Sequence, residues 1–483
     1  MVNERRTGAT SRRAASVSGG ARSLLRRHWP VLLPVAAAVV LRVLAEIAIY
    51  PGIWFSDSNG YVKAAATGIL TPTRVSGYAL LVSPFWHAGS AAALIALQHA
   101  IGIALVVALY ALLVRRGAPR WLAALCVVPA AVDAYLIVVE HAIMSETLYH
   151  ACLAGALIAL LWSDRLSVPA AAVGGLLLGY AGVTRSVGVG LVAVFFVYLL
   201  ARRVGWRPLL GFAAGWLVIA GGYTTLFHHQ HGSFAFESTG GRFLYARVAP
   251  FADCAKLHGV PVDQRSLCPD PNHRLTTNSY LWSRRSPIRG RKDDFRIRSF
   301  ALRVVEQQPL DYIRVVARGV VHYFEPGHRI GPNDYPVQVW QFPADPRHWG
   351  YPGYRGPIRP GIPRLHKLHP ITPSRLVSRM VVRPRLNPGV SRVLHDYQRV
   401  VYTYGPLLAA CVIAALAALV TRRGSLRLRL DAALVAGFVL AALTIAQALS
   451  VFSYRYGLIA ALYLPIAAGL GVTALLQGRR PAA

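Results

Sequence analysis

The chain has 483 residues, of which 54% are apolar and only 15% are charged, and its mean hydropathy is +0.41. A soluble protein of this length would have about a quarter of its residues charged. Lipid cannot hydrogen-bond a peptide group, so apolar chains of this kind cross membranes as helices or closed barrels. The strand alternation of a barrel is absent. The composition therefore excludes an ordinary soluble enzyme and predicts an all-α integral membrane protein.

The formal net charge of +32 could suggest nucleic-acid binding. Much of this charge lies in short connections predicted to face the cytoplasm, where anionic lipid attracts it. The rest includes an arginine-rich cluster at 284–298, which is either general surface charge or a contact for an anionic ligand. A basic patch outside the cytoplasm and close to a bilayer meets lipid phosphates or anionic glycan more readily than DNA. We therefore expect membrane lipids as partners and no nucleic acid.

Apolar blocks near the roughly 20 residues that a membrane helix needs recur along the chain. They lie at 29–50, 91–114, 121–139, 143–162, 168–184, 187–200, 208–227, 400–420, 432–452 and 458–476. The first block is too long for a signal-peptide core and has no good cleavage site, so we expect it to be retained. The sequence thus predicts a multi-span bundle of about ten transmembrane helices, of which the pair at 168–200 is the shortest.

Arginines in the short connections set the expected orientation, because basic residues favour the cytoplasmic side. The connections predicted to face inward lie at 12–27, 115–120, 164–165, 202–207, 422–429 and 479–480, and most contain at least two arginines. The outward connections at 140–142, 185–186 and 453–457 contain few. With ten spans, both chain ends lie on the cytoplasmic side of the membrane, and the functional loops lie on the opposite side. The expected location is a bacterial inner membrane.

The predicted spans divide the chain into five parts. These are a disordered basic cytoplasmic tail at 1–28, an N-terminal transmembrane module at 29–229, an extracytoplasmic domain at 230–399, C-terminal transmembrane helices at 400–477 and a cytoplasmic tail at 478–483. Cys254 and Cys268 both fall in the extracytoplasmic part, where oxidation is permitted, so we expect a disulfide. Cys126, Cys152 and Cys411 lie in spans and are interpreted as small apolar residues.

The extracytoplasmic part has an irregular composition. Apolar residues at 299–323 follow a helical spacing that Pro309 interrupts, which predicts two short amphipathic helices at the membrane surface or packed on the bundle. Residues 325–388 are rich in Pro, Gly, aromatics and Arg and are typical of a long loop. The sequence has no Gly-rich phosphate loop, and its histidines show no metal-ligand spacing; His228, His229 and His231 are expected at the membrane interface.

Charged residues at the outer ends of the spans are the candidates for chemistry, because such residues are costly beside lipid. The first outer loop has one acid, Asp57, which directly follows the first span, and then Tyr61, Lys63 and Arg74. The alternative for Asp57 is structural. Asp57 or Ser58 could cap a short helix at about 59–67.

The second outer connection is bracketed by Glu140 and Glu146, with His141 between them. Two acids beside so short a connection are costly unless they are used or paired. The ordinary interpretation is that Ser145 caps the next helix and that Glu146 interacts favourably with its first turn.

Arginines occupy the later outer connections. Arg185 lies in the third, and Arg455 lies between Tyr454 and Tyr456 in the last. Acids on early loops and arginines on later loops suit a site that deprotonates a nucleophile beside a bound anion. Structural ion pairs between the loops would give the same pattern.

These features occur together in a recognisable order. The acid after the first span is followed by Gly77-Tyr78 and Pro84, by Met-Ser-Glu-Thr at 144–147, by a Gly-rich apolar run ending in Arg185, and by Arg-Tyr-Gly at 455–457 before an apolar helix with Pro465. In this order the chain resembles the glycosyltransferase C superfamily. The closest patterns are those of bacterial relatives of protein O-mannosyltransferases and of the aminoarabinose transferase that modifies lipid A. The likeness covers roughly residues 29–200 and 430–477.

The resemblance implies a specific activity. Such enzymes take a sugar from a polyprenyl-phosphate carrier and pass it to an extracytoplasmic glycan, lipid or protein, usually with inversion. It implies that Asp57 is the general base and that Glu140 or Glu146 assists it or helps to bind a divalent metal. It also implies that Arg185 and Arg455 hold the carrier phosphate, supported by Lys63 and Arg74. Tyr61, His141 and Tyr456 flank these residues and complete the expected substrate-binding set.

The sequence departs from the family pattern in one respect, and two other classes remain open. Many relatives have two adjacent acids in the first loop, whereas Ser58 follows Asp57 here, which weakens the inference of a metal site and leaves a divalent metal cofactor as an open alternative. A lipid or oligosaccharide transporter would have charges within the spans, for which Arg42, Glu46 and Asp133 are the candidates. A non-catalytic envelope assembly protein is the third possibility.

Overall fold

The computed structural model describes residues 4–290, 293–331, 333–346, 379–380 and 385–477, and these residues form a mainly helical protein. The first part of the chain consists of α1 Glu4–Ala48, α2 Ser56–Thr67, α3 Tyr78–His87, α4 Ala91–Arg115, α5 Arg120–Cys126, α6 Val128–Val132, α7 Ala134–Glu140, α8 Glu146–Leu161, α9 Val168–Thr184, α10 Val187–Ala201 and α11 Trp206–His231.

The second part contains shorter helices and then the C-terminal spans. Its elements are α12 Gly240–Val248, the 3-10 helices η1 Cys254–Lys256 and η2 Val262–Leu267, α13 Thr277–Trp282, α14 Asp294–Gln307, α15 Pro309–His322, the 3-10 helix η3 Val337–Trp340, α17 Pro388–Val400, α18 Gly405–Val420, α19 Leu426–Leu449 and α20 Tyr454–Gln477. A two-residue pairing joins β1 Ile49–Tyr50 to β2 Arg385–Leu386 in antiparallel register.

All ten predicted apolar blocks contain helices, but the count of about ten spans is not confirmed. Within the described residues, 5 helices are long and apolar enough to cross a membrane: Arg26–Ala48 of α1, α4, α11, α19 and α20. The pair α17 and α18, bent by 51°, would make a sixth. Helices α8, α9 and α10 are apolar but have only 16, 17 and 15 residues.

The predicted span at 121–139 is divided into α5, α6 and α7. Pro129 stands in the first turn of α6, where its missing N–H ends the preceding helical hydrogen bonds. Asp133 then adopts an extended backbone conformation, and its carboxylate accepts hydrogen bonds from the amides of Tyr135 and Leu136. An apolar pattern cannot report such breaks, because each short helix remains buried and apolar.

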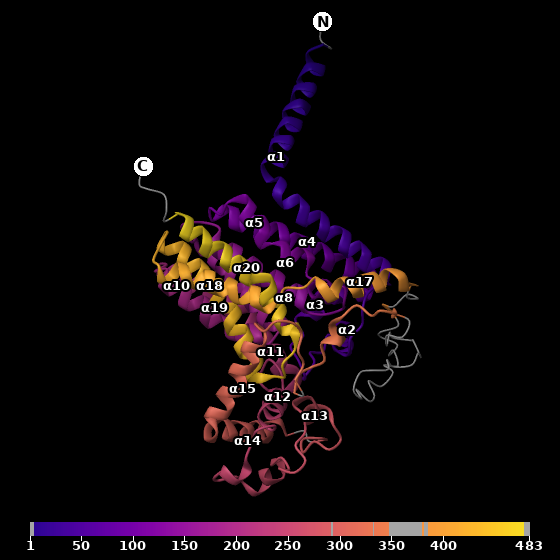
Figure 1. The fold of residues 1–483 in the computed structure, drawn as a ribbon, viewed down its shortest axis with the longest axis vertical. Helices are drawn as coiled ribbons and strands as arrows, with labels where there is room; N and C mark the ends of the chain where they lie inside the picture. Colours follow the sequence, from indigo (N-terminus) through magenta and orange to yellow (C-terminus); the bar gives the residue numbers. More distant parts are fainter. Residues whose placement is uncertain (1–3, 291–292, 332, 347–378, 381–384, 478–483) are drawn as a thin grey trace.

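The N-terminal tail differs from our expectation. Residues 4–27, which we predicted to be disordered, are helical and run into the first span with a change of direction at His28. Pro30, two residues later, lacks the N–H that a continuous helix would use. The His28 ring is 3.0 Å from the hydroxyl of Tyr110 on α4. Figure 1 shows the helix before this kink projecting away from the rest of the molecule.

Two local predictions for residues 230–399 agree with the structure. Helix α15 begins at Pro309, as the interrupted spacing predicted, and its Tyr312 donates a hydrogen bond of 2.9 Å to the carbonyl of Ala448 at the end of α19. Cys254 and Cys268 form the expected disulfide. Most of the predicted loop at 325–388 lies outside the described residues. Helices α12 to α15 form a lobe at the end of the bundle opposite the N-terminal part of α1 (Figure 1).

Candidate active site

The loop that we predicted to be the first outer connection presents Asp57 on α2 without using it as a helix cap. Helix α2 begins at Ser56, and Asp57 stands in its first turn. Ser58 occupies the hydrogen bonds at this helix end: its hydroxyl accepts from the Phe55 amide at 3.0 Å and donates to the Ile143 carbonyl at 2.9 Å. The second of these bonds joins the first outer loop to the second. The Asp57 carboxylate is therefore available to residues from other parts of the chain.

Two arginines from distant parts of the sequence bind the two oxygens of Asp57. Arg74 Nη1 lies 2.7 Å from Oδ1, and Arg455 Nη1 lies 2.9 Å from Oδ2. The Asp57 side chain is 23% exposed, and that of Arg455 is only 12% exposed. The first and last outer connections thus meet at Asp57.

Glu146 extends this ion pair into a chain. It is the first residue of α8, where the positive end of the helix dipole favours a carboxylate, and its side chain is 3% exposed. Arg455 Nε lies 3.2 Å from Glu146 Oε1, and Arg185, the residue that follows α9, pairs with the same oxygen. The five residues Arg74, Asp57, Arg455, Glu146 and Arg185, from four outer connections, are called the Asp57 cluster below.

Ser145 does not act as the side-chain cap that the ordinary interpretation predicted for α8. No side-chain hydrogen bond caps this helix. Instead, the Tyr61 hydroxyl donates to Ser145 Oγ at 3.0 Å. Tyr61 therefore ties α2 to the start of α8, directly beside Glu146.

Aromatic rings cover the arginines of the Asp57 cluster. The guanidinium of Arg455 lies 4.7 Å from the ring centre of Trp340 and 5.3 Å from that of Tyr456. Arg185 lies 5.4 Å from Tyr456 and 5.8 Å from Tyr149. A cation over an aromatic face is stabilised by roughly 0.5–2 kcal/mol and is shielded from water. These rings contact the faces of the guanidinium groups, so the N–H groups at their edges remain directed at the carboxylates or at an anion that replaces them.

The electrostatic balance of the cluster is positive. Burial raises the pKa of the Asp57 carboxyl, but the guanidinium groups of Arg455 and Arg74 outweigh this effect and hold the pKa well below its usual range. Three guanidinium groups face two carboxylates, which leaves one excess positive charge. A divalent cation does not fit such a set, because both acids are already paired with arginines. An anion does.

Glu140 lies outside the Asp57 cluster, although we had placed it beside Asp57 as one of two alternatives. Its carboxylate accepts hydrogen bonds from Arg42 at 2.8 and 2.9 Å. Arg42 also donates to the carbonyl of Ala131 at 3.0 Å, so this pair joins α1 to the α6 region. Glu140 and Glu146 border one small buried cavity, but Asp57 is not among the residues that line it.

The other predicted binding residues are divided between three places. The ring centre of Tyr61 lies 5.8 Å from the guanidinium of Arg74. The ring of Tyr456 lies against Arg185 and Arg455 of the Asp57 cluster. Lys63 is exposed on α2 and is not part of the described ion-pair chain. His141 is fully buried beside His99 of α4, in a separate group of side chains.

Glu237 is a further acid beside the site, and the sequence analysis missed it. The Ser238 amide donates to the Pro72 carbonyl at 2.7 Å, which attaches this segment to the loop that contains Arg74. Burial raises the pKa of Glu237 to about 7, and the positive charge of Arg74 opposes this effect. Glu237 is the first acid after the apolar block at 208–227. Asp57 was chosen because it is the first acid after a predicted span, and the same criterion would have selected Glu237.

Comparisons with known proteins leave the family of the chain open. No family model matches the sequence, and no curated protein matches it. A search of solved structures finds a chain of the Saccharomyces cerevisiae protein O-mannosyltransferase Pmt1-Pmt2 complex bound to the sugar donor, with 15% sequence identity and a TM-score of 0.32. The match covers 46% of this chain and 36% of that chain. A likeness at this level carries no information about activity.

Proposed function

We propose that the chain is a membrane glycosyltransferase that moves a sugar from a polyprenyl-phosphate carrier to an extracytoplasmic acceptor, with the Asp57 cluster as its active site. The observation that carries this proposal is the sharing of Arg455 between Asp57 and Glu146, with Arg185 and Arg74 at the two ends. Residues that the sequence resemblance assigns to a base and to phosphate contacts thereby lie in direct contact.

The charge of the cluster suits the donor. A sugar linked to polyprenyl phosphate is a phosphodiester with one negative charge, which matches the one excess positive charge. Guanidinium groups bind phosphate oxygens with paired, charge-assisted hydrogen bonds. The carrier phosphate gains a second negative charge as the sugar leaves, and arginines fixed against Trp340, Tyr149 and Tyr456 stabilise that charge without moving.

Because Asp57 is paired with arginines, binding of the donor would also change the basicity of Asp57. A carboxylate held by two guanidinium groups is a weak base. When the carrier phosphate binds Arg455 and Arg74, it competes for their N–H groups, and the pKa of Asp57 rises toward its ordinary value. The arrival of the donor thus prepares the base that the reaction needs.

The transfer step follows from these roles. The acceptor hydroxyl oxygen attacks the anomeric carbon of the sugar on the face opposite the phosphate, and its proton passes to Asp57. The bond between that carbon and the phosphate oxygen breaks, and the electron pair leaves with the phosphate. General-base catalysis of this kind contributes roughly 10²–10⁴-fold to the rate. One displacement inverts the anomeric centre.

Transport is less well supported by the same residues. A transporter needs charged groups within the spans that can change partners. Arg42 is bound to Glu140 and to backbone carbonyls, while Asp133 caps α7 and accepts both the amide and the hydroxyl of Thr403 at 2.7 Å. Arg42 and Asp133 hold helices together, and the third candidate, Glu46, lies in the last turn of α1 and not in the middle of the span, so no specific observation favours transport.

The test is mass spectrometry of carrier lipids and envelope glycans in a deletion strain. We expect carrier-linked sugar to accumulate and one sugar to disappear from an envelope acceptor. Both changes should be reversed by the wild-type gene and not by the Asp57→Asn variant produced at the same level. Unchanged carrier lipids and glycans, or full rescue by Asp57→Asn, would exclude the proposed reaction at this site.

A further inference from the structure

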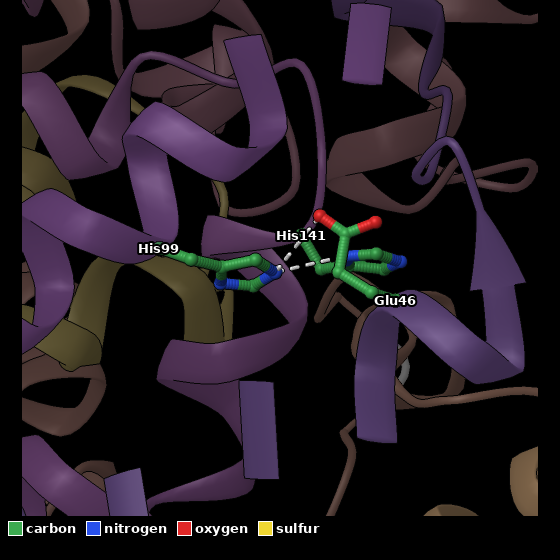
Figure 2. A group of neighbouring side chains, drawn as sticks. All are labelled: Glu46, His99 and His141. Atoms are coloured by element: carbon green, nitrogen blue, oxygen red, sulfur yellow. Dashed lines mark hydrogen bonds and ion pairs between the residues drawn. The ribbon is translucent and has the colours of Figure 1, made fainter. Parts of the chain in front are cut away.

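A second group of polar side chains lies apart from the Asp57 cluster, near the outer end of the first span. Glu46 comes from the last turn of α1, His99 from α4, and His141 directly follows α7. One ligand atom from each lies within 4.8 Å of the other two. Figure 2 shows one nitrogen of His99 in contact with both the His141 ring and the Glu46 carboxylate. No residue of this group contributes to the proposed transfer chemistry.

The hydrogen bonding of His141 fixes which of its nitrogens faces the group. Its Nε2 lies 2.8 Å from the carbonyl oxygen of Ile49. A carbonyl can only accept, so Nε2 carries the proton of the neutral ring. Nδ1 therefore presents a lone pair toward His99, whose Nε2 is 3.0 Å away.

The environment of His99 likewise directs a nitrogen lone pair toward the other ring. Its Nδ1 lies 3.6 Å from Glu140 Oε2 and is buried without a hydrogen bond. A carboxylate bound to Arg42 can only accept, so Nδ1 is the nitrogen that carries the proton, and Nε2 presents a lone pair. Two nitrogen lone pairs then face each other at 3.0 Å, with Glu46 Oε1 at 4.0 Å from His99 Nε2. Three acceptors directed at one point repel unless a cation lies between them.

We propose that Glu46, His99 and His141 bind one divalent transition-metal ion, and that Zn²⁺ fits them best. Two imidazoles and one carboxylate, with a solvent molecule as fourth ligand, form a common tetrahedral zinc site. Metal–ligand distances of about 2.0–2.2 Å put the ligand atoms roughly 3.3 Å from one another. The two nitrogens are already near this separation. Glu46 is 26% exposed and closes the remaining gap by a side-chain rotation.

The groups behind the ligands support this assignment. A metal-bound histidine usually donates its other ring N–H to a carboxylate or a backbone carbonyl, which fixes the ring and its tautomer. The Ile49 carbonyl accepts from His141 at 2.8 Å, and Glu140 Oε2 is the carboxylate oxygen that faces His99 Nδ1, at 3.6 Å. One outer partner is therefore hydrogen-bonded, and the other lies beyond hydrogen-bond distance.

The metal would take no part in the transfer reaction. It would fix the position of the loops that form the active site. The His141 carbonyl accepts from the Ile53 amide at 2.7 Å, and the Ile53 carbonyl accepts from the Ile143 amide at 3.1 Å. These bonds fasten the connection between Glu140 and Glu146 to the segment that leads to Asp57. A metal at His141 would hold both segments against α1 and α4. His141 is thus a positioning residue.

The test measures metal binding directly, so it does not depend on the proposed transfer reaction. The full chain is purified in detergent with a tag that contains no histidine, and its zinc is measured by mass spectrometry. Protein stripped with a chelator is then titrated with Co²⁺, whose visible absorption reports tetrahedral coordination. The variants are Glu46→Gln and His99→Gln, and the control is His395→Gln, because His395 is a partly buried histidine with its own carbonyl partner at 2.7 Å.

We expect about one zinc ion per wild-type and control chain, a tetrahedral Co²⁺ spectrum, and at least tenfold weaker binding in both ligand variants. Should His99→Gln fail to fold, Glu46→Gln and the wild-type titration decide. Zinc added to the stripped wild-type protein should also raise its melting temperature. Substoichiometric zinc in the wild type, or equal zinc in all four proteins, would mean that His99 and His141 share a proton and no metal. Loss of transfer with intact metal binding would count against the proposed function alone.

Discussion

The two ends of the bundle have charge clusters of the same composition and different surroundings. The Asp57 cluster has three arginines and two acids. At the other end of α9, about 25 Å away at 1.5 Å per residue, Arg116, Arg202 and Arg427 meet Asp164 and Asp431, and these five residues are called the Asp431 cluster. Arg116 pairs with both acids, and Arg427 lies 2.5 Å from Asp164.

The neighbours of the arginines separate the two clusters. In the Asp431 cluster, Arg202 donates to the carbonyls of Leu160 at 2.7 Å and Asp164 at 2.8 Å, and the Tyr198 hydroxyl donates to Asp431 at 2.7 Å. These bonds tie α8, α10 and α19 together, which is a structural task. In the Asp57 cluster, aromatic faces cover the guanidinium groups. The number of charged residues and the end of the bundle at which they lie therefore do not identify an active site. The groups that contact the arginines do.

The largest expected effect is a difference in turnover between substitutions of the acids in the two clusters. Asp57→Asn keeps the shape of the side chain, and its one amide oxygen can still accept from one of the two arginines, but it is no longer a carboxylate base. We expect turnover to fall by about 10²-fold or more while the protein folds and binds carrier lipid nearly normally. The measurement is single-turnover transfer with saturating donor.

The matched variant is Asp431→Asn. Asp431 is fully buried and paired, so this variant should lose stability and retain the turnover of its folded fraction. Full turnover in Asp57→Asn would move the base to Glu146 or Glu237. Failure of Asp57→Asn to accumulate in the membrane would give Asp57 the same structural task as Asp431.

Arginine substitutions should show the next largest difference. Arg455→Ala and Arg185→Ala each remove a phosphate contact worth roughly 1.5–3 kcal/mol, so carrier affinity should fall by about 10- to 100-fold, with slower transfer. Because both arginines contact Glu146, the double variant should be non-additive. The measurement is carrier-lipid binding to detergent-solubilised protein. Arg202→Ala is the control, and an equal loss of affinity there would remove the distinction between the clusters.

A smaller effect concerns pH and Glu237. Its folded pKa of about 7 lies above its ordinary value of 4.5, because burial and nearby Asp294 raise it more than Arg74 lowers it. The folded state therefore binds a proton that the unfolded state releases, and stability falls as pH rises from about 4.5 to about 7. Glu237→Gln should melt at a higher temperature than the wild type at pH 8 and at the same temperature below pH 4.5. A constant offset at both pH values would contradict the burial of this carboxyl.

The smallest effect is expected for Asp164→Asn. The Asp164 side chain is 85% exposed although two arginines contact it, and exposed ion pairs contribute at most about 1 kcal/mol. Melting temperature and turnover should both stay within error of the wild type. A clear loss of turnover would show that the Asp431 cluster influences the reaction from a distance.

Local patterns in the sequence predicted the helical blocks, the break at Pro309 and the disulfide between Cys254 and Cys268. They also predicted that acids and arginines of the outer connections would be neighbours, because short loops at one end of a bundle converge. The structure joins Asp57 to Arg74 and Arg455, and Glu146 to Arg185 and Arg455. The roles of these residues stay predictions.

Partner choice inside the bundle was not predictable. Glu140 pairs with Arg42 and not with the outer arginines, because packing of α7 on α1 decides which side chains meet. The group of Glu46, His99 and His141 comes from three elements with no recognisable spacing. The division of 121–139 was also missed, since Pro129 and Asp133 interrupt the helix without interrupting its apolar character.

The position of Arg455 has a kinetic consequence for the proposed reaction. This one side chain restrains the Asp57 carboxylate while no donor is present, so a stray water or acceptor hydroxyl meets an inactive base. An ordered mechanism follows, in which the donor binds first and the acceptor second, and hydrolysis of the donor is suppressed. After transfer, the spent carrier has two negative charges and binds the same guanidinium groups more tightly than the donor did. Release of the spent carrier then limits turnover.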